Sequence, residues 1–171
     1  MANFQPREIL RTLGAHGVKY VIIGNLGSTL YGSPLTTNDA DICPSREEEN
    51  LVALAAALQH MRARIRTPDA PDGIPFACDA TFLGQMKMVN LTTRFGDVDL
   101  SFEPSGTGGY DDLSQRATAI ELRDGISTRI ASLEDIIRSK EAANREKDRM
   151  ALPTLRLLLE KIRERDGPPK R

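Results

Sequence analysis

Two aspartates separated by one residue, Asp39 and Asp41, are the side chains best placed to carry chemistry. Residues 39–43 are predicted to form a strand, in which side chains at i and i+2 share a face. Both carboxylates then point the same way, while Ala40 and Ile42 face the core. Two like charges held this close are unfavourable unless a cation or a proton intervenes. Mg²⁺ suits the pair because it prefers oxygen ligands and leaves room for substrate phosphates. The plain alternative is a solvated acidic strand edge.

A second acidic pair, Asp97 and Asp99, lies on another predicted strand. A third carboxylate beside Asp39 and Asp41 would complete a two-metal site for phosphoryl transfer. One such acid could also serve as the base toward an attacking hydroxyl. Because Asp97 and Asp99 have the same parity along their strand, both are candidates for the third carboxylate.

A predicted buried strand, residues 18–23, runs into a turn that contains Gly24 and Gly27 and opens a short helix. Glycine lets backbone N–H groups approach an anion closely, and the start of a helix favours negative charge. This turn is therefore a candidate anion site, although a tight turn with no ligand is the plain alternative.

Lysine continues the apolar stripe of a later predicted helix, because Leu133, Ile136, Ile137 and Lys140 follow one another at i, i+3, i+4 and i+7. Such a lysine either points into a cleft or extends from the edge of the core to solvent. Asp148 could orient Lys140 or a nearby arginine through an ion pair. The alternative for Asp148 is a solvated helix charge.

The elements that must position these residues alternate between helices and strands. Apolar and β-branched runs predict strands over residues 18–23, 39–43, 86–93, 95–102, 117–122 and 126–130. Helical spacing predicts helices over residues 5–16, 26–31, 45–61 and 110–116, a helix that opens at Ser132, and a last helix along Leu155, Leu158, Leu159 and Ile162. The fold class is therefore α+β, with a mixed sheet flanked by helices.

Local signals set several boundaries of these elements. Ser45 is a candidate N-cap for the helix over 45–61, and Ser132 with Asp135 resembles a capping box. Pro153 indicates the start of the last helix or a kink in it. The prolines and glycine of residues 66–79 predict a loop, and residues 105–109 predict a flexible link.

The composition is typical of a globular protein. Its 171 residues fit one domain, with residues 1–131 as the core and residues 132–171 as a helical segment that completes it. The net charge of −1 excludes a strongly basic coat protein, and no apolar run approaches a membrane span. We expect a cytoplasmic protein without a secretory signal, whose Cys43 and Cys78 are reduced thiols.

Together these segments resemble the DNA polymerase β nucleotidyltransferase superfamily. The resemblance rests on the order Gly24-Asn25, then Asp39-Ala40-Asp41-Ile42, then Val98-Asp99-Leu100. The string over residues 31–42 (YGSPLTTNDADI) is similar to minimal, single-domain members, including the AbiEii and MenT toxin-like enzymes. The similarity continues in residues 132–140 and 145–148. Asn25 departs from the usual Gly or Ser of the signature, and Ser28 could supply the hydroxyl instead.

The resemblance implies a polymerase β-like fold with C-terminal helices and a catalytic role for three aspartates. Asp39, Asp41 and Asp99 would bind Mg²⁺ or Mn²⁺, and Asp99 would help to deprotonate the acceptor hydroxyl. The nucleoside triphosphate would be bound through Gly24, Asn25, Ser28 and Lys140, with Asp148 supporting Lys140. The acceptor hydroxyl would attack the α-phosphate and pyrophosphate would leave.

The acceptor expected from the resemblance is an RNA, in particular the 3′ end of tRNA, with the chain acting as a toxin that has a cognate antitoxin protein. Residues 138–149 contain five basic and three acidic side chains, and residues 153–171 contain six and three. This surplus allows an RNA-facing basic side, or merely solvated helix faces. The alternatives are nucleotide transfer to a small molecule such as an antibiotic or to a protein, and a non-catalytic antitoxin-like binding module.

Overall fold

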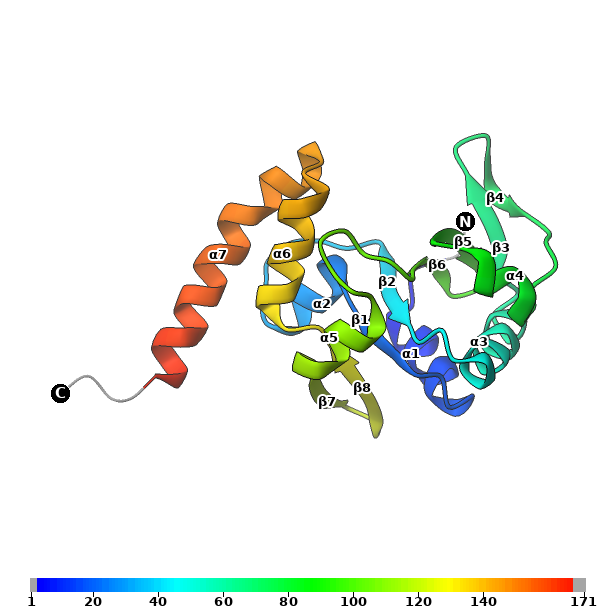
Figure 1. The fold of residues 1–171 in the computed structure, drawn as a ribbon, viewed down its shortest axis with the longest axis horizontal. Coiled ribbons are helices and arrows are strands. Elements are labelled where there is room, and N and C mark those ends of the chain that lie inside the picture. The colour runs from blue at the N-terminus through cyan, green and yellow to red at the C-terminus, as the bar shows by residue number, and fades with distance from the viewer. Residues whose placement is uncertain (1–2, 168–171) are drawn as a thin grey trace.

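A computed structural model describes residues 3–167 and folds them into a mixed α+β structure around one sheet (Figure 1). Eight strands occur in the described part of the chain: β1 (Tyr20–Ile22), β2 (Asp39–Pro44), β3 (Arg64–Thr67), β4 (Ala70–Ile74), β5 (Met88–Thr93), β6 (Gly96–Ser101), β7 (Thr118–Leu122) and β8 (Ile126–Ile130). They form a single sheet in the order β4-β3-β5-β6-β2-β1-β8-β7. The predicted mixed sheet flanked by helices is confirmed.

Seven helices accompany the sheet within residues 3–167: α1 (Pro6–Ala15), α2 (Gly24–Leu30), α3 (Glu48–His60), α4 (Ala80–Gln85), α5 (Tyr110–Arg116), α6 (Leu133–Ala143) and α7 (Glu146–Asp166). Figure 1 shows α6 and α7 at one end of the molecule and the β3–β4 hairpin at the other. Residues 168–171 of the predicted C-terminal segment lie outside the described part, and the division of the chain at residue 131 stays a prediction.

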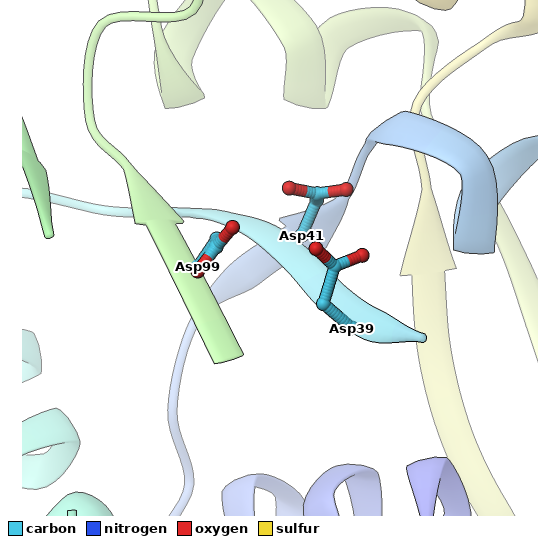
Figure 2. A group of neighbouring side chains, drawn as sticks. All are labelled: Asp39, Asp41 and Asp99. Atoms are coloured by element: carbon cyan, nitrogen blue, oxygen red, sulfur yellow. The ribbon is translucent and has the colours of Figure 1, made fainter. Parts of the chain in front are cut away.

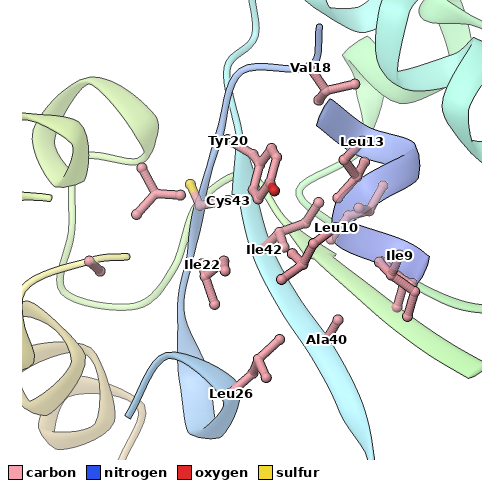
Figure 3. Packing of buried hydrophobic residues seen from close by; sticks show 14 of the residues in the cluster. Ile9, Leu10, Leu13, Val18, Tyr20, Ile22, Leu26, Ala40, Ile42 and Cys43 are labelled. Carbon is pink, nitrogen blue, oxygen red and sulfur yellow. The ribbon is translucent and has the colours of Figure 1, made fainter. Parts of the chain in front are cut away.

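The centre of the sheet alternates between apolar and acidic side chains. Strand β2 runs antiparallel to β1 and parallel to β6. On one face, Ala40, Ile42, Val98 and Leu100 are fully buried. Helix α1 packs Ile9, Leu10 and Leu13 onto this face (Figure 3). The period-2 alternation then directs the aspartates of β2 and β6 to the opposite face.

The segment over residues 66–79 is not the loop that its composition predicts. It contains strand β4 and the end of β3, which together form an antiparallel hairpin at the edge of the sheet. Pro71 is compatible with this position because an edge strand can leave one side of its backbone unpaired. Gly73 adopts φ +81, and a Cβ there would lie 2.5 Å from the Cβ of Arg64, so only glycine fits at this irregular point.

Two expectations about helix starts also differ from the structure: Ser45 as an N-cap, and the start of the last helix at Pro153, which was one of two alternatives for that residue. Helix α3 has Glu47 as its N-cap, because Ser45 Oγ instead accepts a hydrogen bond from the N–H of Glu47 at 3.3 Å in a local turn. Helix α7 begins at Glu146 and contains Pro153 in its interior. The helix continues through Pro153 because Leu152 and Leu155 are buried against the core on either side.

The remaining boundaries agree with the sequence to within a few residues. Ser132 Oγ accepts a hydrogen bond from the N–H of Asp135 at 3.1 Å, which confirms Ser132 as the cap of α6. The predicted hairpin over residues 117–130 is β7 and β8. None of the helices described between residues 3 and 167 is long and apolar enough to cross a membrane.

Candidate active site

Three aspartates from two neighbouring strands converge on the polar face of the sheet (Figure 2). Because β2 and β6 are parallel and in register, Asp41 lies opposite Asp99 and Asp39 lies opposite Asp97. One carboxylate oxygen from each of Asp39, Asp41 and Asp99 lies within 4.8 Å of the others. The sequence had left Asp97 and Asp99 as equal candidates, and the geometry favours Asp99.

Asp97 is turned toward an arginine rather than toward the other carboxylates. Its Oδ2 lies 3.2 Å from Nε of Arg66, and Asp97 does not join the group of three. Arg66 also donates from Nη2 to Oδ1 of Asp99 at 2.8 Å. The guanidinium of Arg66 therefore spans the two acidic side chains of β6.

Burial and nearby negative charges raise the pKa values of Asp41 and Asp99. Burial, followed by the charges of Asp39 and Asp99, raises the pKa of Asp41 to about 7. Burial also raises the pKa of Asp99 to about 6, although the charge of Arg66 counteracts part of this increase. A divalent cation would favour the ionised form of both acids, since it supplies the opposite charge that the repulsion lacks.

The donor set fits a hard divalent metal ion. Asp39, Asp41 and Asp99 offer carboxylate oxygens, which are the ligands preferred by Mg²⁺ and accepted by Mn²⁺. Among residues 3–167, this is the one group of at least three histidine, cysteine or carboxylate side chains with such spacing. The three aspartates predicted as metal ligands are therefore brought together, and their catalytic role stays a prediction.

Gly24 approaches the carboxylate of Asp41 so closely that no side chain could take its place. A Cβ on Gly24 would lie 2.2 Å from Oδ2 of Asp41, far inside van der Waals contact. Gly24 also adopts φ +64, the left-handed region that side chains disfavour. The glycine of the predicted signature is thus required both by the turn and by the neighbouring acid.

Asn25 and Ser28 differ in their relation to the site. Asn25 lines the cavity together with Gly24, and its Nδ2 donates to the carbonyl of Thr36 at 3.3 Å. Its buried Oδ1 has no hydrogen-bond partner among the described residues. Ser28 is fully buried, and its hydroxyl donates to the carbonyl of Asn25 at 2.9 Å. Ser28 therefore supports the turn that carries Asn25 and does not line the cavity.

A cavity with a volume of about 690 Å³ separates the acidic face of the sheet from helix α6 and the start of α7. Its basic lining includes Lys140, Arg145 and Lys147. Lys140 is 12% exposed, and its Nζ lies 3.5 Å from Oδ1 of the fully buried Asp148. The cavity thus has an acidic floor and a basic wall.

Asp148 contacts both partners that the sequence allowed. Besides Lys140, it accepts hydrogen bonds from Nε of Arg145 at 2.7 Å and from the backbone N–H of Arg145 at 3.3 Å. Burial would raise the pKa of Asp148, but these hydrogen bonds and the charges of Arg145 and Lys140 lower it overall. Asp148 is therefore a fixed anion that caps α7 and holds Lys140 beside the cavity.

Sequence reasoning missed Arg66, Asn90, Ser101 and Lys147, all of which line the cavity. Arg66 lies in the segment that was predicted to begin a loop. The alternation of Arg64, Ile65 and Arg66, which is typical of a half-buried strand, is the signal that could have identified it.

Comparison with known proteins defines the class of fold. The chain matches no family model and no curated protein. Among solved structures, it is similar to a crystal structure of a proposed nucleotidyltransferase from Thermotoga maritima, with a TM-score of 0.54 and 18% sequence identity. The match covers 94% of this chain and 97% of that chain. The chain therefore has a nucleotidyltransferase fold, including the C-terminal helices that the sequence predicted.

Proposed function

We propose that this protein is a metal-dependent nucleotidyltransferase, which transfers a nucleoside monophosphate from a nucleoside triphosphate to an acceptor hydroxyl. The observation that carries the proposal is the convergence of Asp39, Asp41 and Asp99 on the floor of the cavity. The nucleotidyltransferase fold supports the same activity. Acidic groups at this spacing in such a fold are suited to hold metal ions against a polyphosphate.

Asp39, Asp41 and Asp99 would hold Mg²⁺ or Mn²⁺. When bound, the metal supplies positive charge against the phosphate oxygens and makes an attacking hydroxyl more acidic. Asp99 would also help to deprotonate that hydroxyl, because its ionised carboxylate lies in the same group as the other two acids and can accept a proton. The acceptor oxygen then forms a bond to the α-phosphorus, the bond to the β-phosphate oxygen breaks, and pyrophosphate departs.

The basic wall of the cavity would receive the triphosphate. Lys140, Arg145 and Lys147 line the cavity opposite the carboxylates. A lysine acts as a point charge toward phosphate oxygens. Because Lys140 is already held beside Asp148, its side chain would lose less conformational entropy when the triphosphate binds. Gly24 and Asn25 would lie at the same phosphates, with the unpaired Oδ1 of Asn25 available to a hydroxyl of the nucleotide.

As acceptor we propose an RNA, in particular the 3′ end of tRNA, with the chain acting as a minimal toxin similar to the AbiEii and MenT proteins and controlled by an antitoxin. The support is the resemblance of residues 31–42 and the basic surplus of residues 138–149, part of which lies at the cavity. A cytoplasmic location would follow from this substrate.

An assay with labelled nucleotides tests the proposal directly. The protein is incubated with each α-labelled nucleoside triphosphate, Mg²⁺ and total tRNA, beside D41A and the exposed control D69A. We expect label on RNA with the wild type and D69A, and a loss of at least about a thousandfold with D41A.

Parallel reactions contain a cell lysate and a panel of hydroxylated antibiotics. Label on these acceptors alone would replace the RNA proposal by protein or small-molecule nucleotidylation. No transfer to any acceptor, together with metal-dependent nucleotide binding that D39A leaves unchanged, would indicate a non-catalytic binding module and contradict the proposal.

A further inference from the structure

Asp97 lies beside the carboxylate group without belonging to it. It shares the acidic face of the sheet and stands opposite Asp39 in the register of β2 and β6. Its Oδ2 lies 3.2 Å from Nε of Arg66, while Nη2 of Arg66 donates to Oδ1 of Asp99 at 2.8 Å. Arg66 therefore connects one acid inside the proposed metal site with one acid outside it.

This bridge is largely enclosed by the protein. The exposed fractions of the side chains are 29% for Arg66, 26% for Asp97 and 19% for Asp99. Charges in such surroundings interact more strongly than charges in bulk water. Nε of Arg66 is buried and forms no hydrogen bond among the described residues, so its approach to Asp97 is a charge contact. The firmer contact of Arg66 is the hydrogen bond to Asp99.

Arg66 and a divalent cation compete for the same carboxylate. With Arg66 on Oδ1 of Asp99, a metal ion held by Asp99 would have a guanidinium charge within a few ångströms, which weakens binding. Asp97 offers this guanidinium a second anion that is not a member of the metal group. Arg66 can then leave Asp99 without becoming an unpaired charge, which would be costly at this degree of burial.

We propose that Asp97 is a positioning residue that retains Arg66 when Asp99 turns toward a metal ion. In the metal-free protein, Arg66 holds the third carboxylate in place. When metal binds, Asp97 keeps the guanidinium and Asp99 becomes free to coordinate. The inference rests on the proposed metal-dependent function of this site, and it assigns a role to the first acid of the sequence Asp97-Val98-Asp99.

A double-mutant cycle on metal binding tests this role without measuring activity. The affinity for Mn²⁺ alone is determined from the electron paramagnetic resonance signal of free Mn²⁺ for wild type, D97N, R66Q and R66Q/D97N. D41N serves as the variant that should abolish binding. E103Q serves as the charge control, because Glu103 lines the same cavity and pairs with Lys87 and Arg46 away from the carboxylate group.

We expect D97N to weaken Mn²⁺ binding about tenfold in the wild-type background, because Asp99 is then the one carboxylate among residues 3–167 that still pairs with Arg66. R66Q alone should tighten binding. In the R66Q background, D97N should change the affinity by less than about threefold, and by no more than E103Q does. This dependence on Arg66 supports the proposal, since a merely structural role would not produce it.

Three results would overturn the inference. D97N could change the Mn²⁺ affinity equally in both backgrounds, which would indicate a general charge effect. It could abolish Mn²⁺ binding in both, which would indicate that Asp97 is a metal ligand. It could also leave the Mn²⁺ affinity unchanged in both. In each case, normal Mn²⁺ binding by the wild type leaves the proposed function intact. A wild type that binds no Mn²⁺ overturns the proposed function and this inference with it. If circular dichroism shows that a variant is unfolded, D97S and R66M complete the same cycle.

Discussion

Asp41 is placed where its charge opposes folding and serves the proposed function. Burial and the charges of Asp39 and Asp99 raise its pKa to about 7 from an ordinary value of 3.8. A carboxyl with a raised folded-state pKa contributes its full stability below the unfolded-state pKa. That contribution is lost as the pH rises through about 7.

We therefore expect D41N to stabilise the metal-free protein at pH 8, by about 2–4 kcal/mol, since one pKa unit corresponds to about 1.4 kcal/mol. The gain should shrink as the pH falls through about 7, and it should vanish only below the unfolded-state pKa of 3.8, where the carboxyl is neutral in both states. Urea unfolding in the presence of a chelator at several pH values measures this, with D69N as an exposed control. A wild type more stable than D41N at pH 8 would contradict the role of burial and repulsion.

Gly24 permits a matched comparison with Gly17. Both have φ near +65, but a Cβ on Gly17 would meet no atom within 4 Å, whereas one on Gly24 would strike Asp41. G17A should cost about 1–2 kcal/mol of stability from backbone strain, and G24A should cost more, because its Cβ also clashes with Asp41. G24A should in addition lower the transfer rate about a hundredfold, because Asp41 must move. Equal loss of activity in both variants would show that strain alone is responsible.

Some of the site could be predicted from single residues and some could not. The alternation of Asp39, Ala40, Asp41 and Ile42 is a local pattern, so the paired carboxylates were evident from the sequence. The choice of Asp99 over Asp97 depends on strand register and on the position of Arg66, neither of which is local. Ser28 was expected at the ligand, but its hydroxyl is used within the turn.

At the scale of elements, the segments that could not be predicted are those whose local conformational preferences conflict with their tertiary contacts. Strands β5 and β6 alternate regularly and were predicted, as were the β7–β8 hairpin and the cap of α6. The β3–β4 hairpin contains Pro71 and Gly73, so its composition indicates a loop. Pairing of β3 with β5 overrides that preference. Arg66 lies on this hairpin, so its place in the site could not be predicted either.

The junction of α6 and α7 depends on Asp148, which links Lys140, Arg145 and the first turn of α7. D148N should destabilise the protein by about 2–3 kcal/mol, because a buried acceptor is weakened and Lys140 loses its partner. The Michaelis constant for the nucleotide should rise, since Lys140 is no longer held at the cavity. Thermal unfolding and steady-state kinetics measure both effects. D166N, at the exposed pair with Arg165, should change neither.

Across the whole molecule, some of the basic side chains that the structure describes are already held in ion pairs and others are not. In the described part of α7, Arg156, Arg163 and Arg165 are paired with Glu141, Glu134 and Asp166. Lys147 lines the cavity instead, and it forms no ion pair within the described part of the chain. Contacts with the phosphates of the proposed RNA acceptor should therefore concentrate near the cavity rather than along the distal half of α7.

Salt dependence measures this distribution. For tRNA binding without nucleotide, K147Q should reduce the slope of log affinity against log salt concentration by about 1, since one phosphate contact is lost. K161Q, on the exposed distal half of α7, should leave the slope unchanged. Fluorescence anisotropy with labelled tRNA gives both slopes. An equal reduction in both variants would indicate that RNA lies along the helix.

The edge strand β4 also bears on how molecules of this protein meet one another. An exposed sheet edge offers unpaired N–H and C=O groups, to which a strand from another chain can add. Pro71 removes a donor from this edge, and Gly73 interrupts its regular extended backbone. The hairpin that places Arg66 at the cavity is thus also a poor template for edge-to-edge aggregation.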